Sequence, residues 1–442
     1  MFNKRRTAAV VGTAAAALVL AACSSGSETT STEETEAAST TAETAAEEAA
    51  ASTCESINVF LIPSPSADAI KAMTPAFTEA TGIDVQFTEV EYGTAHQKAL
   101  LSIQSGQAAF DVVQFDNTFL AAFAKAGALT DIGEWVANSA EYDINDIPTS
   151  LQNYGDFDGV KYGLMLSTEP FIQWYRGDIY DQLGLQPATT WDEYKANAEA
   201  IQDSGLASGQ MMGFGPNTTW WWMQLVWSYG GTLYDSDFNP TVNTPEAVAA
   251  TEYYKSLLPS SPQGALGATG DDVTLQFVGS DIGQMIQYSG YAAGVFDPEN
   301  SPNAANIRVA PVPAGTVNTV ELAGWNIGIP SDAPSPECGW QFLEYMLGKT
   351  NAKTLLENGA AAIGRISIID DPSLQEQYPY LSLLNIAPDV VVNTYPQIVV
   401  WPEFDKVASD NLAKILSGEV EVQAGLDAMQ AALEPVMANE PR

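Results

Sequence analysis

Residues that commonly bind metal ions or act as nucleophiles are scarce in this chain of 442 residues. It contains one histidine, His96, and three cysteines, Cys23, Cys54 and Cys338. These are too few soft ligands for a zinc site or an iron–sulfur cluster, and any histidine-dependent triad would rest on a single residue. We therefore expect no metal, no cofactor and no catalysis that depends on a histidine or a cysteine.

Basic residues are also scarce, and this sets the charge of the chain. Seventeen lysines and arginines stand against 55 aspartates and glutamates, for a formal net charge of -38 at pH 7. So acidic a chain is repelled by phosphate backbones, which excludes nucleic acid as a partner. No glycine-rich phosphate-binding motif follows any expected strand, so nucleotide binding has no support. With 46% hydrophobic residues, the chain is nevertheless long and apolar enough for two or three domains.

The N-terminus has the pattern of a bacterial export signal. Three basic residues at positions 4–6 precede an apolar run from Ala8 to Ala22, which is too short and too rich in alanine for a stable membrane span. The run ends in Leu20-Ala-Ala-Cys23, which resembles a bacterial lipobox, and Ser-Ser-Gly follows. The resemblance implies that residues 1–22 are a lipoprotein signal peptide and that Cys23 becomes a lipidated N-terminus. The alternative is an ordinary signal peptide with a cysteine nearby.

Residues 23–53 are predicted to be the lipidated cysteine and a disordered tether. After Cys23 the chain uses almost only Ser, Thr, Ala and Glu, which cannot bury enough apolar area to offset the entropy of ordering. Removing residues 1–22 takes away three basic residues and no acidic one, so the mature charge becomes -41. No later stretch has 18 uncharged apolar residues. We expect an extracytoplasmic protein, anchored to the bacterial cell membrane through lipid.

Two cysteines remain in the folded part of this exported chain. Cys54 stands at its first residue and Cys338 at an expected helix start far along the chain. Because the compartment is oxidising, we expect a disulfide between them. The alternative is two unpaired thiols.

From Cys54 onward the pattern alternates between short apolar runs and longer amphipathic segments. We expect strands at residues 57–62, 83–90 and 111–115, and helices at residues 67–80, 93–105 and 118–126. Such alternation is typical of an α/β fold with a mostly parallel sheet covered by helices. In these folds, ligands bind at the carboxyl ends of the strands.

A series of short motifs runs through residues 57–437. They include Phe77-Thr-Glu-Ala-Thr-Gly-Ile-Asp-Val, Phe110-Asp-Val-Val-Gln-Phe-Asp, Ala124-Lys-Ala-Gly-Ala-Leu-Thr-Asp-Ile, Trp174-Tyr-Arg-Gly-Asp-Ile-Tyr, Leu322-Ala-Gly-Trp-Asn-Ile-Gly-Ile-Pro and Trp401-Pro-Glu-Phe. Each alone carries little information. In this order they resemble the extracellular solute-binding proteins of the sugar type, which serve ABC importers.

The resemblance implies a two-lobed periplasmic-binding-protein fold of type II, with a ligand cleft between lobes joined by a hinge. It places the N-terminal lobe at residues 54–168 and 323–380, and the C-terminal lobe at residues 169–322 and 381–442. The implied function is that of a monomeric receptor, which closes its lobes over a mono- or oligosaccharide or a polyol and performs no catalysis. Its partners would be that solute and the transmembrane permease subunits of an ABC importer.

Polar side chains near strand ends are the first candidates for solute contacts. Asp116 and Asn117 follow the strand at residues 111–115, although they are equally good caps for the next helix. Tyr92 follows the preceding strand. Glu169 matches a crossover carboxylate of the family, and Pro170 behind it fixes an extended backbone; the alternative is a surface glutamate.

Aromatic residues are the second group of candidates, because flat rings suit the C–H faces of sugars. Three consecutive tryptophans at 220–222 spread over about 200° of a helix, so at least one should face the cleft. The family resemblance favours Trp220 and Trp221, and packing is the alternative. It also implies solute contacts for a further set of residues, namely Tyr288, Tyr291, Trp325, Asn326, Arg365 and Trp401. Arg365 would bind vicinal hydroxyls or pair with Glu169, or serve the structure alone.

Three alternative interpretations of the sequence remain open. Asp235, Asp237, Asn239 and Glu246 have most of the spacing of a calcium loop, but Pro240 stands where the turn requires glycine. Glu169 and Asp116 could in principle be the two carboxylates of an extracellular glycoside hydrolase. Among binding proteins, the runner-up is a receptor for a non-sugar solute such as a polyamine, which carboxylates and an aromatic box would hold.

Overall fold

The computed structural model describes residues 54–206, 216–279, 282–360 and 363–441. The expected signal peptide, lipobox and tether lie outside these residues. Among the helices described, none combines the length and the apolar character that a membrane crossing needs.

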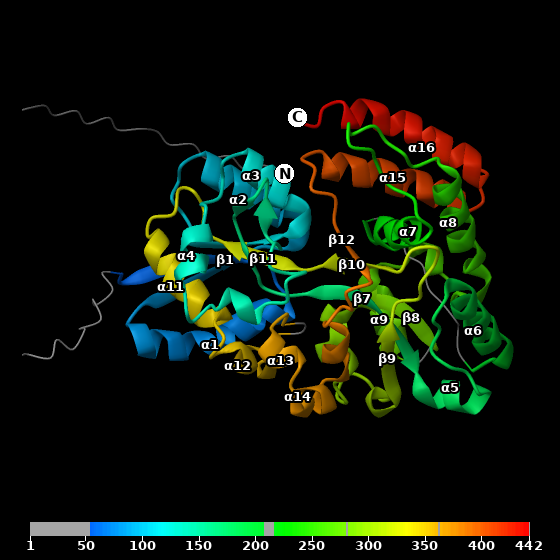
Figure 1. Ribbon diagram of the computed structural model, residues 1–442, viewed down its shortest axis with the longest axis horizontal. Helices are drawn as coiled ribbons and strands as arrows, with labels where there is room; N and C mark the ends of the chain where they lie inside the picture. Colours follow the sequence, from blue (N-terminus) through cyan, green and yellow to red (C-terminus); the bar gives the residue numbers. More distant parts are fainter. Residues whose placement is uncertain (1–53, 207–215, 280–281, 361–362, 442) are drawn as a thin grey trace, which may run out of the picture. The chain divides into compact units, whose positions relative to one another are not determined.

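The first of two five-stranded sheets lies in the part of the chain nearer the N-terminus, and we call it with its helices the first lobe (Figure 1). Its strand order is β2-β1-β3-β11-β6. Three strands run parallel, β1 (Ser56–Leu61), β2 (Asp84–Glu89) and β3 (Val112–Asp116). Two others run antiparallel beside them, β11 (Trp325–Gly328) and β6 (Leu164–Met165).

Alternating side chains of this sheet enter two different cores. On one face Val59, Leu61 and Val112 share a core with residues of the helices α1 (Pro65–Thr81), α11 (Pro336–Leu347) and α12 (Ala352–Glu357). On the other face Phe60, Val113 and Phe115 pack with α2 (Tyr92–Gln104) and α3 (Leu120–Lys125). The two-residue period of a strand explains this division. The strands and helices expected between residues 57 and 126 are confirmed, with ends shifted by one or two residues.

The second sheet defines what we call the second lobe, and its order is β12-β10-β7-β8 with β9 also paired to β7. Its strands are β7 (Glu169–Arg176), β8 (Gln284–Tyr288), β9 (Ile307–Pro311), β10 (Thr319–Ala323) and β12 (Val391–Thr394). Only β10 and β12 are parallel. The expectation of a mostly parallel sheet is therefore wrong for this lobe, because the chain enters and leaves it by strands that run in opposite directions.

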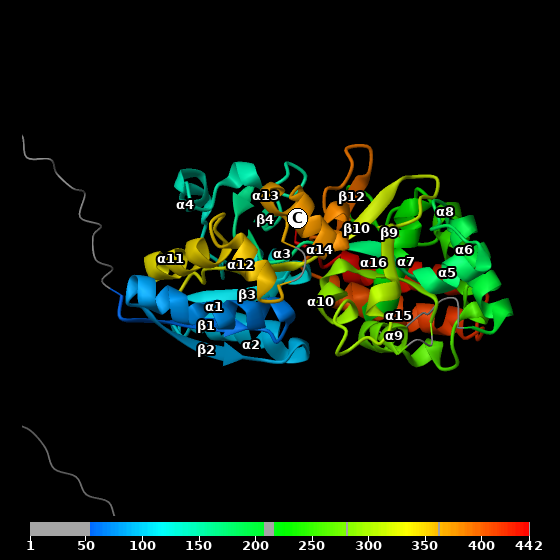
Figure 2. The same cartoon turned by 90° about the horizontal axis from the view of Figure 1, so that it is seen from below.

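Helices cover the second sheet (Figures 1 and 2). Those of this lobe are α5 (Gly177–Leu183), α6 (Trp191–Ser204), α7 (Pro216–Ser228), α8 (Pro245–Ser256), α9 (Gly270–Val278), α10 (Ala292–Val295), α15 (Trp401–Leu416) and α16 (Val422–Met437). Helix α7 packs on β10 and on its neighbours α8 and α15. Local signals explain the starts of two of them, since Thr190 and Thr269 each form a capping box with the acidic residue three positions later.

The chain first passes between the lobes at residues 166–168, and returns at Gly324 between β10 and β11. These two segments lie against each other, since the backbone N–H of Leu166 donates to the carbonyl of Trp325 (2.7 Å). Gly324 has a φ of 147°, and a Cβ there would collide with the carbonyl oxygen of Ser167. Only glycine fits this crossing.

A third passage joins α12 to β12 through the short helices α13 (Ile366–Ile369) and α14 (Pro372–Gln377). A 3₁₀ helix at Pro379–Leu383 then packs against β9 of the second lobe. The boundary that the family resemblance implies, at residue 380, falls within this passage and stays a prediction.

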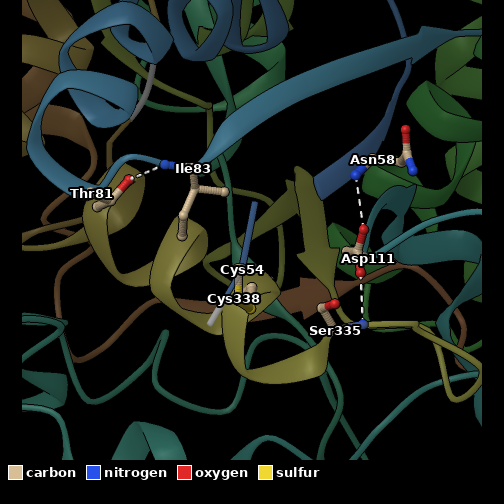
Figure 3. The surroundings of a disulfide bond; sticks show 7 residues. All are labelled: Cys54, Asn58, Thr81, Ile83, Asp111, Ser335 and Cys338. Carbon is tan, nitrogen blue, oxygen red and sulfur yellow. Dashed lines mark hydrogen bonds between the residues drawn. A yellow bond between two sulfur atoms is a disulfide. The ribbon is translucent and has the colours of Figure 1, made fainter. Parts of the chain in front are cut away.

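The disulfide between Cys54 and Cys338 is confirmed, with the two Cα atoms 6.3 Å apart (Figure 3). It ties the chain just before β1 to the first turn of α11. The Asp111 carboxylate holds the same two regions together, because it accepts the backbone N–H groups of Asn58 and Ser335, each at 2.8 Å. The start of the described chain is therefore fixed to the first lobe both covalently and by charge-assisted hydrogen bonds.

Candidate functional site

A cavity of about 600 Å³, which we call the central cavity, is lined by residues of both lobes. It opens at the carboxyl ends of β1, β2, β3 and β8 and beside the crossing at Gly324. Its lining is Ile62, Pro63, Ser64, Pro65, Ser66, Tyr92, Asp116, Glu169, Trp220, Thr269, Asp271, Thr274, Tyr288, Gly290, Tyr291, Gly294, Ala323, Gly324, Trp325 and Tyr395. Seven of these are candidates from the sequence; strand ends indicate Tyr92 and Asp116, and the family resemblance implies Glu169, Trp220, Tyr288, Tyr291 and Trp325.

Aromatic rings form much of the cavity wall. In the first lobe, the Tyr92 ring stands edge-on to Trp325, with centroids 5.8 Å apart. In the second lobe, Trp220 lies 5.9 Å from Tyr288 and 5.7 Å from Tyr395, at interplanar angles of 60° and 64°. Tyr92 is exposed, and Trp220 and Trp325 are half-buried, so these rings can meet a solute. One face of Tyr288, in contrast, is covered by stacking on Phe171. Of the three consecutive tryptophans, Trp220 lines the cavity while also packing against the core.

Asp116 lies at the end of β3 and is 8% exposed. One carboxylate oxygen accepts the Tyr92 hydroxyl (2.9 Å), and the other accepts the backbone N–H of Thr118 (3.0 Å), so the expected capping role and the cavity position coexist. Burial raises the pKa of this carboxyl. Its own backbone N–H donates to His96 Nε2, and burial lowers the pKa of that imidazole to about 3. The only histidine is therefore neutral and supplies no positive charge to Asp116.

Glu169 is the first residue of β7, directly after the crossing from the first lobe. Its Oε1 accepts the Ser167 hydroxyl at 2.6 Å. The carboxylate also lies against Gly290, where any Cβ would collide with it. Burial raises the pKa of Glu169 to about 7, and the nearby charge of Asp116 adds to the rise. Glu169 is thus a cavity residue, held in place by a hydroxyl donor and a glycine.

Asp271 is a third carboxyl-bearing residue of the cavity and was not anticipated. It stands in the first turn of α9, and its Oδ1 accepts the Tyr291 hydroxyl at 2.7 Å. The capping-box pattern Thr269-Gly-Asp-Asp272 predicts a helix start here. That pattern could have suggested Asp271, but nothing in the local sequence shows that α9 begins at the cavity.

A buried carboxyl stands behind the aromatic wall of the second lobe. Glu321 on β10 is fully buried and accepts the Tyr288 hydroxyl, which in turn lies 2.8 Å from the Tyr395 hydroxyl. Burial raises the pKa of Glu321 well above the usual range of a carboxyl. Both tyrosines line the cavity, so Glu321 positions two hydroxyl groups that a solute would meet. Tyr395 was also missed as a site residue, since its position depends on the third passage between lobes.

Several sequence candidates lie away from the central cavity. Asn117 and Asn326 are buried and bond to each other, because the Asn326 amide donates to Asn117 Oδ1 at 3.2 Å. Trp325 pairs with Asp116 across β11 and β3, and Asn326, one residue further, points to the opposite face. The assignment of both asparagines to the solute site is corrected to a structural link between strands.

Two tryptophan assignments are corrected in the same way. Trp221 is 5% exposed, stacks at 12° on Phe171, and donates its indole N–H to the Ile286 carbonyl at 2.7 Å. Trp401 is 4% exposed and stacks on Phe404 at the start of α15. Both side chains are part of the hydrophobic core, and neither is in the lining of the central cavity.

Arg365 neither faces the central cavity nor pairs with Glu169. It is 3% exposed and forms an ion pair with Asp146 at 3.3 Å. It also donates to the carbonyls of Leu347 and Tyr142, and its guanidinium lies 5.0 Å from the centre of the Tyr142 ring. The structural alternative for Arg365 is therefore the correct one.

The segment with calcium-loop spacing forms a turn instead. The Asp235 carboxylate accepts the backbone N–H groups of Asp237 and Asn239, each at 2.9 Å. Thr244 caps α8, and Glu246 lies in the first turn of that helix. Within the described ranges, no group of three or more His, Cys, Asp or Glu residues could hold a metal ion.

The fold agrees with the comparisons to known proteins. The pattern that defines bacterial extracellular solute-binding proteins matches residues 63–353, about two thirds of the chain, and the protein therefore belongs to this family. Members of the family are transport receptors and not enzymes, and they work outside the cytoplasm. The two-lobed fold inferred from the motifs is confirmed.

Individual relatives are distant. A Sinorhizobium fredii protein named probable amino-acid ABC transporter periplasmic-binding protein y4oP is 25% identical over 71% of this chain and 73% of its own length. Two crystal structures share the fold, each with a TM-score of 0.76. One is an Agrobacterium radiobacter solute-binding protein in complex with ribitol (24% identical, covering 86% of this chain and 98% of that one). The other is a Thermotoga lettingae protein bound with α-D-tagatose (20% identical, covering 87% and 100%).

Proposed function

We propose that the protein is a lipid-anchored receptor that captures a carbohydrate or polyol outside the cytoplasm and delivers it to the permease subunits of an ABC importer. The observation that carries the proposal is the central cavity, whose wall combines six aromatic rings with three carboxyl groups and several hydroxyls. Ring faces suit the C–H faces of such solutes, and carboxylates accept their hydroxyl groups. Structural neighbours described with ribitol and α-D-tagatose support this solute class.

A thermal-shift panel of sugars, polyols and polyamines tests the solute class. A compound present at about 100 times its Kd should add about 2.7 kcal/mol to the free energy of unfolding. Isothermal titration of the best compounds then gives affinities. A response to polyamines alone would overturn the proposal and favour the alternative receptor class. Release of chromophore from aryl glycosides would instead indicate a hydrolase.

The two-lobed fold also predicts closure around the solute. A solute that contacts both Tyr92 of the first lobe and Trp220 of the second gains more contacts in the closed state, and so shifts the population toward it. Small-angle scattering should show a smaller radius of gyration at saturation with the compound that the thermal-shift panel identifies. An unchanged value would contradict closure.

The anchor is tested separately, because it concerns residues outside those described. Mass spectrometry of protein extracted from membranes should find Cys23 as the N-terminus, carrying diacylglycerol. Cys23→Ala should leave the precursor unlipidated. An N-terminus elsewhere would refute the anchor and leave the solute proposal intact. Size-exclusion chromatography with light scattering tests the expectation of a monomer.

A further inference from the structure

The carboxyl groups of the central cavity have no basic partner. Among the described residues that line the cavity, three carry carboxyl groups and none is lysine, arginine or histidine. The internal segments outside the described ranges contain no basic residue either. The hydrogen bonds that Asp116, Glu169 and Asp271 accept come from neutral hydroxyls and one backbone N–H. The described lining thus offers no cation that would stabilise the ionised forms of these carboxyl groups.

This arrangement is costly in the empty protein. A carboxylate removed from water without a cation is destabilised, and two carboxylates near each other destabilise each other further. Asp116 and Glu169 come from different lobes, yet the charge of one affects the other. Glu169 also keeps acceptor capacity, because the hydrogen bond from Ser167 uses only its Oε1 and the residue lines the cavity. A ligand with positive charge would supply what the chain lacks.

The aromatic walls are compatible with a cation. The faces of Trp220, Trp325 and the cavity tyrosines carry the negative part of a ring quadrupole, which attracts an ammonium group. The net charge of -38 would also draw cations toward the protein. Hydroxyl groups of Ser64 and Thr274 in the same wall suit a polyhydroxylated solute better than a bare alkyl diamine.

We propose that the solute of the central cavity carries a protonated amine in addition to several hydroxyl groups, as an amino sugar or an amino-polyol does. This inference rests on the proposed function and narrows it. The amine would lie between Glu169 and Asp116, or beside Asp271, with the hydroxyl-bearing carbon chain against the rings. The charge-assisted bonds would then form only when the solute is present.

Matched pairs of compounds that differ in the amine test the inference by isothermal titration at pH 7.5. The pairs are D-sorbitol with N-methyl-D-glucamine, and D-glucose with D-glucosamine; N-acetyl-D-glucosamine is a neutral control, and putrescine is a cation without hydroxyls. In at least one pair the amine should bind at least about tenfold more tightly than its neutral partner, from charge-assisted and cation–π contacts. N-acetylation should remove the gain.

Two charge-removing variants show whether the preference arises in the cavity. Glu169→Gln should lower the ratio of the affinity for the amine to the affinity for its neutral partner at least about fivefold, because the substitution removes one charged acceptor. Glu79→Gln removes the same charge from an exposed position near the far end of α1 and should change the ratio less than about twofold. An equal loss in both variants would mean that the preference comes only from net charge, and would overturn the inference.

The outcomes separate this inference from the function on which it rests. If neutral sugars or polyols bind as tightly as their amines or more tightly, the inference fails and the proposed receptor stands. If putrescine binds and no polyhydroxy compound does, both fail. Tighter binding of an amine, reduced by Glu169→Gln, supports both.

Discussion

Asp146, which is buried, and Glu169, which is half-buried, differ in how their charge is balanced. In the first lobe, Asp146 is 6% exposed and accepts the Ser367 hydroxyl and backbone N–H as well as the Arg365 guanidinium. In the central cavity, Glu169 has a neutral hydroxyl donor and no cation. Asp146 thus has all its partners within the chain. Glu169 has acceptor capacity left over and lines the cavity, whereas Glu321, whose Oε2 also has no hydrogen-bond partner among the described residues, is buried behind the cavity wall. Free acceptor capacity therefore indicates a solute contact only where the carboxyl group lines the cavity.

The largest effect should come from removing the cation that pairs with Asp146. Arg365→Met would leave Asp146 buried without its cation, and should lower the free energy of unfolding by about 3–5 kcal/mol. Denaturant unfolding monitored by tryptophan fluorescence measures this. Where the variant remains folded, its solute affinity should equal that of the parent. A loss of solute affinity without a loss of stability would show that Arg365 contacts the solute.

At Glu169, which has no cation partner in the described cavity lining, we expect a loss of solute binding and not of stability. Glu169→Ala should weaken binding of the compound selected by the thermal-shift panel by roughly 2–4 kcal/mol, about 30- to 1,000-fold, because charge-assisted bonds to the solute are lost. Titration calorimetry gives the affinity, and a melt of the free variant checks the fold. Asp237→Ala, on an exposed turn, is the control. Parent-like binding by Glu169→Ala would show that the solute does not touch this side of the cavity.

The pH dependence of stability should distinguish the same residue. The pKa of Glu169 is about 7 in the folded protein, against 4.5 for an unperturbed glutamate. Between these values the folded state binds more protons than the unfolded state, so this group lowers the free energy of unfolding as pH rises. The free energy of unfolding of Glu169→Gln, relative to that of the parent, should therefore rise by roughly 1–3 kcal/mol between pH 4.5 and pH 8. Most of this rise should occur below pH 7. A difference that does not change with pH would contradict the raised pKa.

The sequence predicts the first lobe and the strand-end residues well because both depend on local patterns. Short apolar runs locate β1 and β3, and the ends of the expected strands locate Asp116 and Tyr92. Arg365 could not be assigned, because its partner Asp146 lies 219 residues away and becomes a neighbour only in the fold. Asn326 was misassigned because a one-residue step along a strand reverses the side that a residue faces.

The smallest effects should come from the neighbouring tryptophans of α7, which local sequence could not separate. One residue along a helix turns the side chain by about 100°, so Trp220 reaches the cavity while Trp221 enters the core. Trp221→Phe removes the N–H that pairs with the Ile286 carbonyl, and should cost about 1–2 kcal/mol of stability with solute affinity unchanged. Trp220→Phe keeps a smaller ring at the cavity wall and should cost about 0.5–1.5 kcal/mol of binding, with the melting temperature nearly unchanged. Melts and titrations of both variants measure the two effects. If either variant lost stability and affinity together, the division of α7 into a core face and a solute face would be wrong.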